Sequence, residues 1–231
     1  SDRHMSSQQT GISRLLLCSS DKGKLEPFRE RLMNSGVDVD CATEAEHAQQ
    51  LLWTRHYDGV AIDLLLADRD GISFAMELRQ QHPWVSILVI STTPNWGKRE
   101  TRPDWLYRSA DYARLVFALK QAAQRSAGRP PSILHVEEDD SLAELVQNTI
   151  GRQTKLFRAR SAHEAQIAMA LRKYDLALIR TLMPSLSPEW KGHLAAQQPV
   201  LCINAETGHD PLLTILNNLR PTPHFHQPAY C

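Results

Sequence analysis

The sequence predicts an α/β fold, a parallel sheet with helices on both faces, and it predicts this unit twice in tandem. Short apolar segments alternate with segments whose apolar residues recur at helical spacing, a pattern typical of parallel sheets covered by helices. The same order of segments occurs in both halves. Tyr174 follows Tyr57 by 117 positions, and Ser161 follows Thr43 by 118. A nearly constant offset between independent landmarks indicates an internal duplication.

The composition excludes several classes of function. The 231 residues are enough for two domains with a core each, and 42% of them are hydrophobic. Lys and Arg total 26, as do Asp and Glu, so no net charge attracts the chain to nucleic acid or to a membrane. No apolar segment is long enough to cross a bilayer, and the cysteines follow neither a metal-binding nor a disulfide spacing. We therefore expect a cytoplasmic protein with reduced thiols and no direct contact with nucleic acid or membrane.

In the first half, strand and helix segments alternate regularly. Strands are expected at residues 14–18, 37–41, 57–63, 85–91 and 105–106. Helices are expected at about 25–33, 45–52, 72–81 and 110–123. Gly36 is expected to end the first helix, and Thr43 with Glu46 has the spacing of a capping box for the second.

The second half repeats this order after a segment rich in chain breakers. Strands are expected at 133–136 and 174–180, a helix at 142–150 ended by Gly151, and a capping box at Ser161 and Glu164. We therefore expect a first domain at 11–125, a linker at 126–131 and a second domain at 132–231. The two prolines of the linker should make it stiff.

Two segments carry a resemblance to a known family. Residues 57–71, which contain Asp63, resemble the phospho-acceptor segment of response-regulator receiver (CheY-like) domains. Residues 133–142, which contain Glu137 and Glu138, resemble the acidic first loop of the same family. The resemblance covers nearly the whole chain as two tandem copies. It implies that each copy has a flavodoxin-like fold, with a five-stranded parallel sheet and helices on both faces.

The resemblance also implies a chemistry, in which an aspartate takes a phosphoryl group from a histidine kinase. The ends of neighbouring strands meet at one edge of a parallel sheet, where such folds bind their ligands. Two acids after the first strand and the acceptor hold Mg²⁺, which prefers oxygen ligands and offsets charge during transfer. A hydroxyl after the fourth strand and a lysine after the fifth then contact the phosphoryl group.

The first copy keeps only part of that site. The acceptor position is Asp63, the hydroxyl position is Ser91, and Arg108 stands at the lysine position. The two acid positions are Ser19 and Ser20, which are not acidic. Two interpretations stay open: a weakly working acceptor, or a relic carboxylate held by Arg108 and the two serines.

A metal site in the first copy depends on a shifted loop. If the first loop moves by one residue, Asp21 and Asp63 are candidate ligands for weakly bound Mg²⁺. No other cofactor is expected.

The second copy has lost different residues. It keeps the acids Glu137 and Glu138, but Arg180 stands at the acceptor position, and a guanidinium cannot accept phosphate. The hydroxyl position is Asn204 and the lysine position is Gln227. We hypothesise that Arg180 reaches one of the two acids and stands where Mg²⁺ would bind; the alternative is that it points to solvent.

Two lengths depart from the family. Ser91 and Arg108 are 17 positions apart, whereas Asn204 and Gln227 are 23 apart, so the first copy is expected to have a shortened fourth helix. The second copy has no residues for a final helix before Cys231. Either the chain is cut before that helix, which we favour, or another surface covers the sheet.

These features predict an atypical bacterial tandem-receiver response regulator, or its input module, in cytoplasmic two-component phosphorelay signalling. We expect no enzymatic activity, and action through protein–protein contacts with weak or no phosphorylation. The expected partners are a histidine kinase or phosphotransfer protein, another protein, or a second copy of the chain. The alternatives are the regulatory part of a larger output enzyme, such as a diguanylate cyclase, and a stand-alone adaptor.

Overall fold

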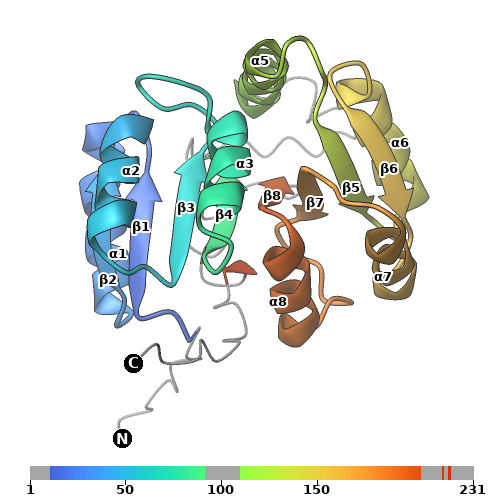
Figure 1. The fold of residues 1–231 in the computed structure, drawn as a ribbon. Helices are drawn as coiled ribbons and strands as arrows, with labels where there is room; N and C mark the ends of the chain where they lie inside the picture. The colour runs from blue at the N-terminus through green and yellow to red at the C-terminus, as the bar shows by residue number, and fades with distance from the viewer. Residues whose placement is uncertain (1–10, 92–109, 204–214, 216–217, 220–231) are drawn as a thin grey trace, which may run out of the picture.

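The computed structural model describes residues 11–91, 110–203, 215, 218 and 219, which form one parallel sheet with helices on both faces (Figure 1). The strands are β1 (Arg14–Cys18), β2 (Asp38–Ala42), β3 (Gly59–Asp63), β4 (Ser86–Ile90), β5 (Ser132–Val136), β6 (Lys155–Ala159), β7 (Leu176–Arg180) and β8 (Val200–Ile203). The central strands are almost continuously apolar and buried, as expected for strands covered on both faces.

The order of the strands across the sheet is β2-β1-β3-β4-β8-β7-β5-β6, and all neighbours are parallel. The first four strands have the order of the flavodoxin-like doubly wound fold. The last four repeat that order in the opposite direction across the sheet. The predicted α/β class, with a parallel sheet and alternating helices, is confirmed.

The two separate five-stranded sheets implied by the resemblance differ from the structure. Strand β4 pairs with β8, with Leu88 opposite Val200 and Val89 opposite Leu201, so both sets of four strands belong to one sheet. An unpaired strand edge is a liability, and this pairing satisfies one edge of each strand. The segments expected to form fifth strands, at 105–106 and 225–228, lie outside the described residues, as does the expected shortened fourth helix.

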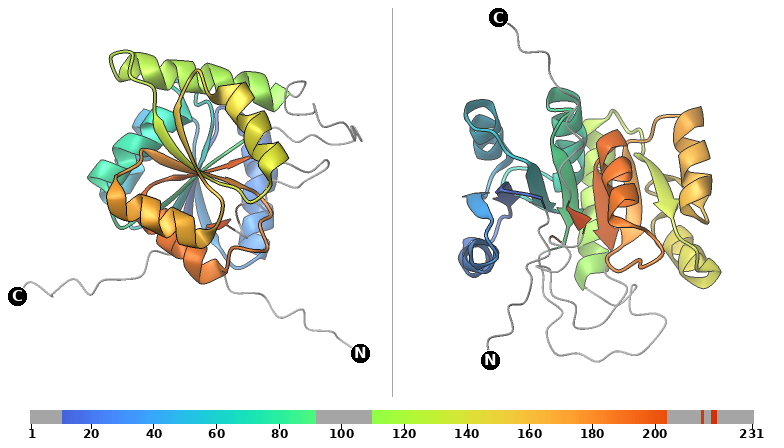
Figure 2. Two further views of the ribbon diagram at one scale, coloured as in Figure 1. Left: turned by 90° about the vertical axis from the view of Figure 1, so that its right-hand side faces the viewer. Right: turned by 90° about the horizontal axis from the view of Figure 1, so that it is seen from below.

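Equivalent helices of the two halves lie on opposite faces of the sheet (Figure 2). The helices of the described residues are α1 (Lys22–Asn34), α2 (Ala45–Thr54), α3 (Gly71–Gln81), α5 (Ala110–Arg125), α6 (Asp140–Ile150), α7 (Ala162–Leu171) and α8 (Pro188–Gln197). Helices α2, α3, α5 and α6 bury side chains in the core on one face, and α1, α7 and α8 do so on the other. The second half is therefore turned over relative to the first.

Helix α5 covers the sheet beside α6. Its apolar side chains share one core with residues of α6, β5 and β7. The core on this face therefore contains side chains of α5 together with side chains of the second half.

Some of the predicted helix ends are confirmed and one is wrong. Gly36 has φ 86° and ends α1, with its N–H donating to Met33 O and that of Val37 donating to Leu32 O. Ser161 caps α7 by accepting from the N–H of Glu164. The capping box at Thr43 is wrong, because the N-cap of α2 is Glu44, which makes no side-chain cap.

Helix α2 is capped from a distant segment instead. The carboxylate of Asp68, in the loop after β3, accepts from the N–H of Ala45 at 2.7 Å and from that of Glu46 at 3.1 Å. A carboxylate at a helix N-terminus satisfies free N–H groups and the helix dipole. The loop after β3 is thereby tied to α2.

The segment at 126–131 forms a tight turn. Ala127 and Gly128 both have positive φ, at 54° and 80°, and the N–H of Gly128 donates to Ala123 O at 2.8 Å. The turn ends α5 and leads directly into β5.

No helix in the described part of the chain is long and apolar enough to cross a membrane.

Gly71→Ala should strongly destabilise the fold. A Cβ at Gly71 would lie 1.9 Å from the carbonyl oxygen of Asp63, which is backbone and cannot move aside cheaply. We expect a loss of about 2–3 kcal/mol or more in the free energy of unfolding, measured by urea denaturation. Gly36→Ala is the matched control: its Cβ would meet nothing within 4 Å, and only its positive φ should cost about 1 kcal/mol. Equal losses in the two variants would contradict the close approach.

Candidate functional sites at the carboxyl ends of the strands

Two carboxylate sites lie at the carboxyl-terminal edge of the sheet, one in each half. Asp63 is the last residue of β3, and Glu137 directly follows β5. Because all strands are parallel, both sites lie on the same edge. Both carboxylates are withdrawn from solvent, with 2% of Asp63 and 0% of Glu137 exposed.

In the first site, the carboxylate of Asp63 is held by a hydroxyl and a guanidinium. Ser19, directly after β1, donates from Oγ to Oδ2 of Asp63 at 3.0 Å. Arg114, on α5, donates from Nη2 to Oδ1 at 3.0 Å and to Oδ2 at 3.1 Å. Charge-assisted hydrogen bonds of this kind stabilise the ionised carboxylate.

The arginine at Asp63 is not one that the sequence identified. Arg108 was expected at this position and lies outside the described residues. Arg114 was missed because its approach depends on which face of the sheet α5 covers. The only sequence signal was a cation near the start of the predicted helix.

The other residues predicted for the first site lie at the same edge. Ser91 follows β4, whose Ile90 pairs in register with Asp63, and it is half-buried. Asp21 is the N-cap of α1, and its Oδ1 accepts from the N–H of Gly23 at 3.0 Å. Ser20 is exposed.

The first site does not fit Mg²⁺. The guanidinium of Arg114 contacts both oxygens of Asp63, so a cation bound there would meet a like charge at close range. Asp21 is used as a helix cap. Across 11–91 and 110–203, no three acidic, histidine or cysteine side chains are grouped as metal ligands would be. Arg114 provides the positive charge next to Asp63.

The second site contains an ion pair that the sequence predicted. Arg180, the last residue of β7, donates from Nε to Oε2 of Glu137 at 2.8 Å, and its Nη2 lies 3.7 Å from Oε1 of Glu138. The other oxygen of Glu137 accepts from the N–H of Asp139 at 3.1 Å. Asn204 and Gln227, also predicted here, lie outside the described residues.

A second arginine, Arg158 on β6, was missed. Its Nε and Nη2 donate to the carbonyl oxygen of Glu137 at 3.1 and 3.0 Å, and its Nη1 lies 2.6 Å from Oδ1 of Asp140. The bond and charge of Arg158 lower the pKa of Asp140. The contact follows from the register of β5 and β6, which places His135 opposite Arg158.

His135, on β5, is a buried neutral base beside these charges. Burial, together with the positive charges of Arg158 and Arg180, lowers the pKa of His135 to about 4. Its exposed fraction is 1%. A proton on His135 would add a third positive charge beside the two arginines.

The loop between β3 and α3 positions a second buried carboxylate near the first site. Asp70 caps α3 by accepting from the N–H and Oγ of Ser73 at 2.6 and 2.7 Å, and Arg125 of α5 lies 3.6 Å away. Arg69 pairs with Glu77 through two hydrogen bonds. Helix α5 thus contacts this half through an arginine near each of its ends.

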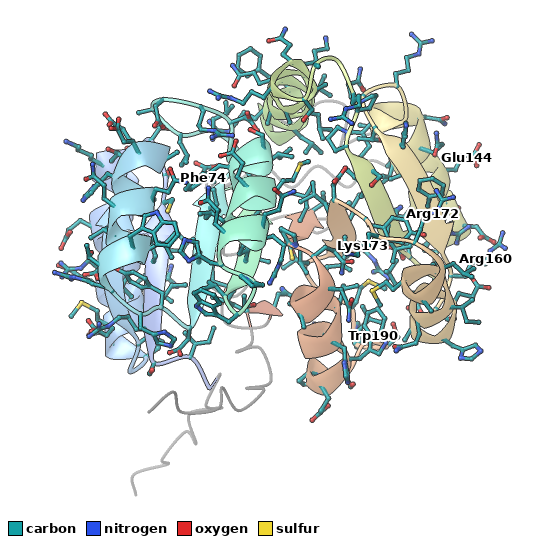
Figure 3. All side chains as sticks on the ribbon, in the orientation of Figure 1. Phe74, Glu144, Arg160, Arg172, Lys173 and Trp190 are labelled. Carbon is teal, nitrogen blue, oxygen red and sulfur yellow. The ribbon has the colours of Figure 1, made fainter. Side chains whose placement is uncertain are left out.

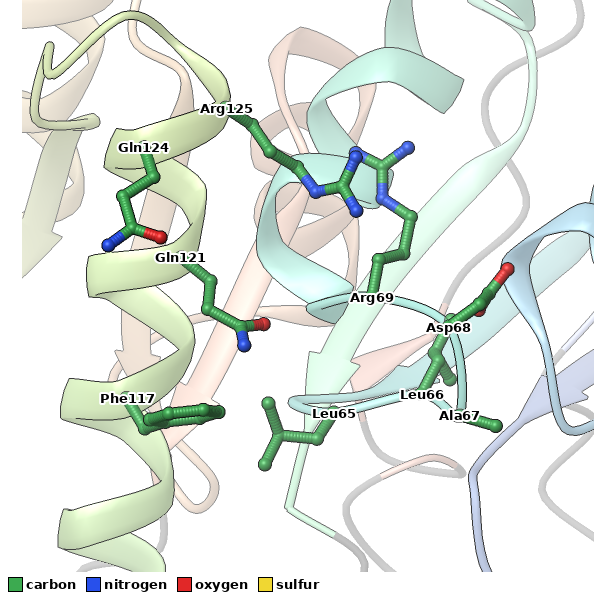
Figure 4. A pocket seen from close by; sticks show the side chains of 9 residues that line it. All are labelled: Leu65, Leu66, Ala67, Asp68, Arg69, Phe117, Gln121, Gln124 and Arg125. Atoms are coloured by element: carbon green, nitrogen blue, oxygen red, sulfur yellow. The ribbon is translucent and has the colours of Figure 1, made fainter.

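A hollow of about 470 Å³ lies between this loop and α5 (Figure 4). Arg69 and Arg125 lie side by side at one end, and Phe117 faces Leu65 at the other. Phe117 is 52% exposed, although α5 buries its neighbours. Aromatic residues and arginine are both enriched in protein-binding surfaces.

Two arginines lie over aromatic rings. Phe74 of α3 is fully buried, with the guanidinium of Arg69 over its ring at 5.6 Å (Figure 3). On the outer side of the second half, the guanidinium of Arg172 lies 4.4 Å from the centre of the Phe157 ring.

No protein-family model matches the chain. The chain is similar to the two-component response regulator PhoP of Pseudomonas aeruginosa, with 29% identity over 103 residues, 42% of this chain and 46% of that protein. It is also similar to the alginate biosynthesis transcriptional regulatory protein AlgB of Pseudomonas putida, with 30% identity over 87 residues, 38% of this chain and 19% of that protein. The chain therefore spans less than half the length of each of these relatives.

A solved response regulator receiver domain (CheY-like) from Methylobacillus flagellatus is 28% identical, with a TM-score of 0.34; the match covers 38% of this chain and 76% of that one. Together, the sequence relatives support a similarity to response regulators of two-component systems.

Arg180→Met should destabilise the fold through Glu137. The substitution leaves a fully buried carboxylate without its guanidinium, which should cost about 3–5 kcal/mol of unfolding free energy. The double variant Arg180→Met/Glu137→Gln should recover most of that loss, because no charge remains buried. Urea denaturation of the wild type, both single variants and the double variant gives the coupling energy. Additive losses would contradict the ion pair.

The His135→Leu variant should lose less unfolding free energy than the wild type as the pH falls. The pKa of His135 is about 4 in the folded protein against 6.5 when unperturbed, so between these values the unfolded chain binds a proton that the folded chain does not. Its contribution is fully present above pH 6.5, and about 3 kcal/mol is lost as the pH falls to about 4. The measurement is the difference in unfolding free energy between wild type and variant from pH 7 to 4. Parallel curves would contradict it.

Proposed function

We propose that the chain is an atypical tandem-receiver regulator of two-component signalling, or the input module of one, that acts through protein contacts with weak or no phosphorylation. The proposed domains are 11–125 and 132–231, joined at 126–131. The observation that carries the proposal is the guanidinium of Arg114 on both oxygens of the buried Asp63. The similarity to response regulators supports the signalling context.

The arrangement at Asp63 disfavours phosphoryl transfer. A carboxylate that attacks phosphorus must give up hydrogen bonds that stabilise its ionised form, and Asp63 accepts such bonds from Ser19 and Arg114. Bonds that stabilise the ground state more than the transition state slow a reaction. The acids that would hold a charge-neutralising metal are replaced by Ser19 and Ser20.

The second half contains no nucleophile at the corresponding position. Arg180 stands at the acceptor position and donates a hydrogen bond to Glu137, which stands at a metal-ligand position. We propose that this pair replaces the metal, so that the second half is a pseudo-receiver held permanently in one state.

The hollow beside α5 is the surface that we propose for the protein partner. It combines the exposed ring of Phe117 with the guanidinium of Arg125, and it adjoins the loop that leads from Asp63 to α3. The partner segment that fits is one with an apolar side chain and a carboxylate, since these would contact the two ends of the hollow.

Incubation with acetyl phosphate and Mg²⁺, followed by intact-mass analysis, tests the proposal. We expect no phosphoryl adduct on the wild type, because both oxygens of Asp63 are occupied and no acid pair is present. Arg114→Ala/Ser20→Asp, which removes the guanidinium and restores one acid, should raise adduct formation above the wild type.

Asp63→Asn is the control for the site of modification, and a complete receiver domain is the control for the reagent. An adduct on the wild type as abundant as that on the complete receiver domain, and absent from Asp63→Asn, would make the first half a fully working acceptor and overturn the proposed weak or absent phosphorylation.

A further inference from the structure

The two halves of the sheet meet at a short seam. The ladder between β4 and β8 has two paired positions, fewer than any other ladder of the described sheet. Arg79 of α3 reinforces the seam, because its Nη2 donates to Ala195 O of α8 at 2.6 Å and its Nη1 to Pro83 O at 2.9 Å. So short a ladder has few hydrogen bonds of its own to join the halves.

Helix α5 crosses the seam on one face of the sheet, and Figure 2 shows it between α3 and α6. Its charged side chains reach the first half, where Arg114 contacts Asp63 and Arg125 contacts Asp70. Its apolar side chains belong to a core that includes side chains of both halves. These side chains of α5 are Leu115, Ala118, Leu119 and Ala122, and the second half adds Ile133, Val146, Ile150, Leu176, Leu178, Leu201 and Ile203.

Three described residues near the end of the chain, Ile215, Asn218 and Leu219, contact both halves on the other face. Leu219 packs over Gly59 of β3, where an added Cβ would lie 2.7 Å from its Cδ2, and it also lies close to Ile12. Asn218 donates from Nδ2 to the carbonyl oxygen of Thr181 at 3.1 Å, directly after β7. Ile215 is buried in the same core. A segment from the end of the second half therefore covers a strand of the first.

We infer that α5 on one face, and Ile215, Asn218 and Leu219 on the other, are two clasps that make both halves one cooperative unit, and that α5 couples Asp63 to the second half. Each clasp buries side chains against both halves, so neither half keeps its core if the other opens. Arg114 is part of α5 and binds the carboxylate of Asp63. Loss of that contact therefore alters how α5 packs in the core that it shares with β5, β7 and α6. The inference does not depend on whether Asp63 accepts a phosphoryl group.

Native-state hydrogen exchange of the full chain, without a phosphodonor, tests the inference. Leu219→Ala should speed amide exchange in β1, β3 and α1 of the first half by about tenfold or more, since it removes a buried side chain from their core. Leu171→Ala is the matched control, because Leu171 is in the same half and 80% exposed; it should leave the first half unchanged. A change confined to residues 132–203 in Leu219→Ala would overturn the inference.

Arg114→Ala tests the other clasp and keeps the question answerable if Leu219→Ala does not fold. Faster exchange is expected in α6, β5 and β7 as well as around Asp63. Arg55→Ala removes the same charge from a surface pair with Asp40 in the first half and should leave the second half unchanged. Effects confined to the first half in Arg114→Ala, or equal effects in both variants, would overturn the coupling through α5.

Discussion

Much of this structure depends on the parallel pairing of β4 with β8. That pairing joins eight strands in one sheet and turns the second half over, so that equivalent helices cover opposite faces. It also determines what each helix can cover. Helix α5 follows the first set of strands, yet the core that it enters contains β5, β7 and α6. The carboxyl ends of all strands still meet at one edge, which is why both acidic sites remain there.

Positive charge from arginine is common to the two sites, although it comes from different elements. Asp63 is neutralised by Arg114 from α5, and Glu137 by Arg180 from the end of β7. A buried carboxylate is costly unless it is paired and hydrogen-bonded, and a guanidinium does both. The same arrangement leaves little reason for a divalent cation at Asp63.

Some of the helix ends and ion pairs could be predicted from sequence spacing, and others could not. The stop at Gly36 and the cap at Ser161 follow from local backbone geometry, and both are confirmed. The cap of α2 is supplied by Asp68, 23 positions from Ala45, and spacing alone pointed wrongly to Thr43. The Arg180 pair was predictable because strand ends in a parallel sheet lie close together. Arg114 was not, because its place depends on the path of the chain to α5.

The sequence by itself determined the alternation of strands and helices, their near-duplicate order, and the residue types at each strand end. These depend on local periodicity and on short-range backbone preferences, which the order of amino acids contains directly. Only the tertiary structure decided that β4 would pair with β8, that α5 would cross the seam, and that Arg114 would contact Asp63. Those outcomes depend on which strand edges pair and which apolar faces pack together. Because hydrophobic burial is non-directional, several such arrangements are compatible with the same pattern of apolar residues.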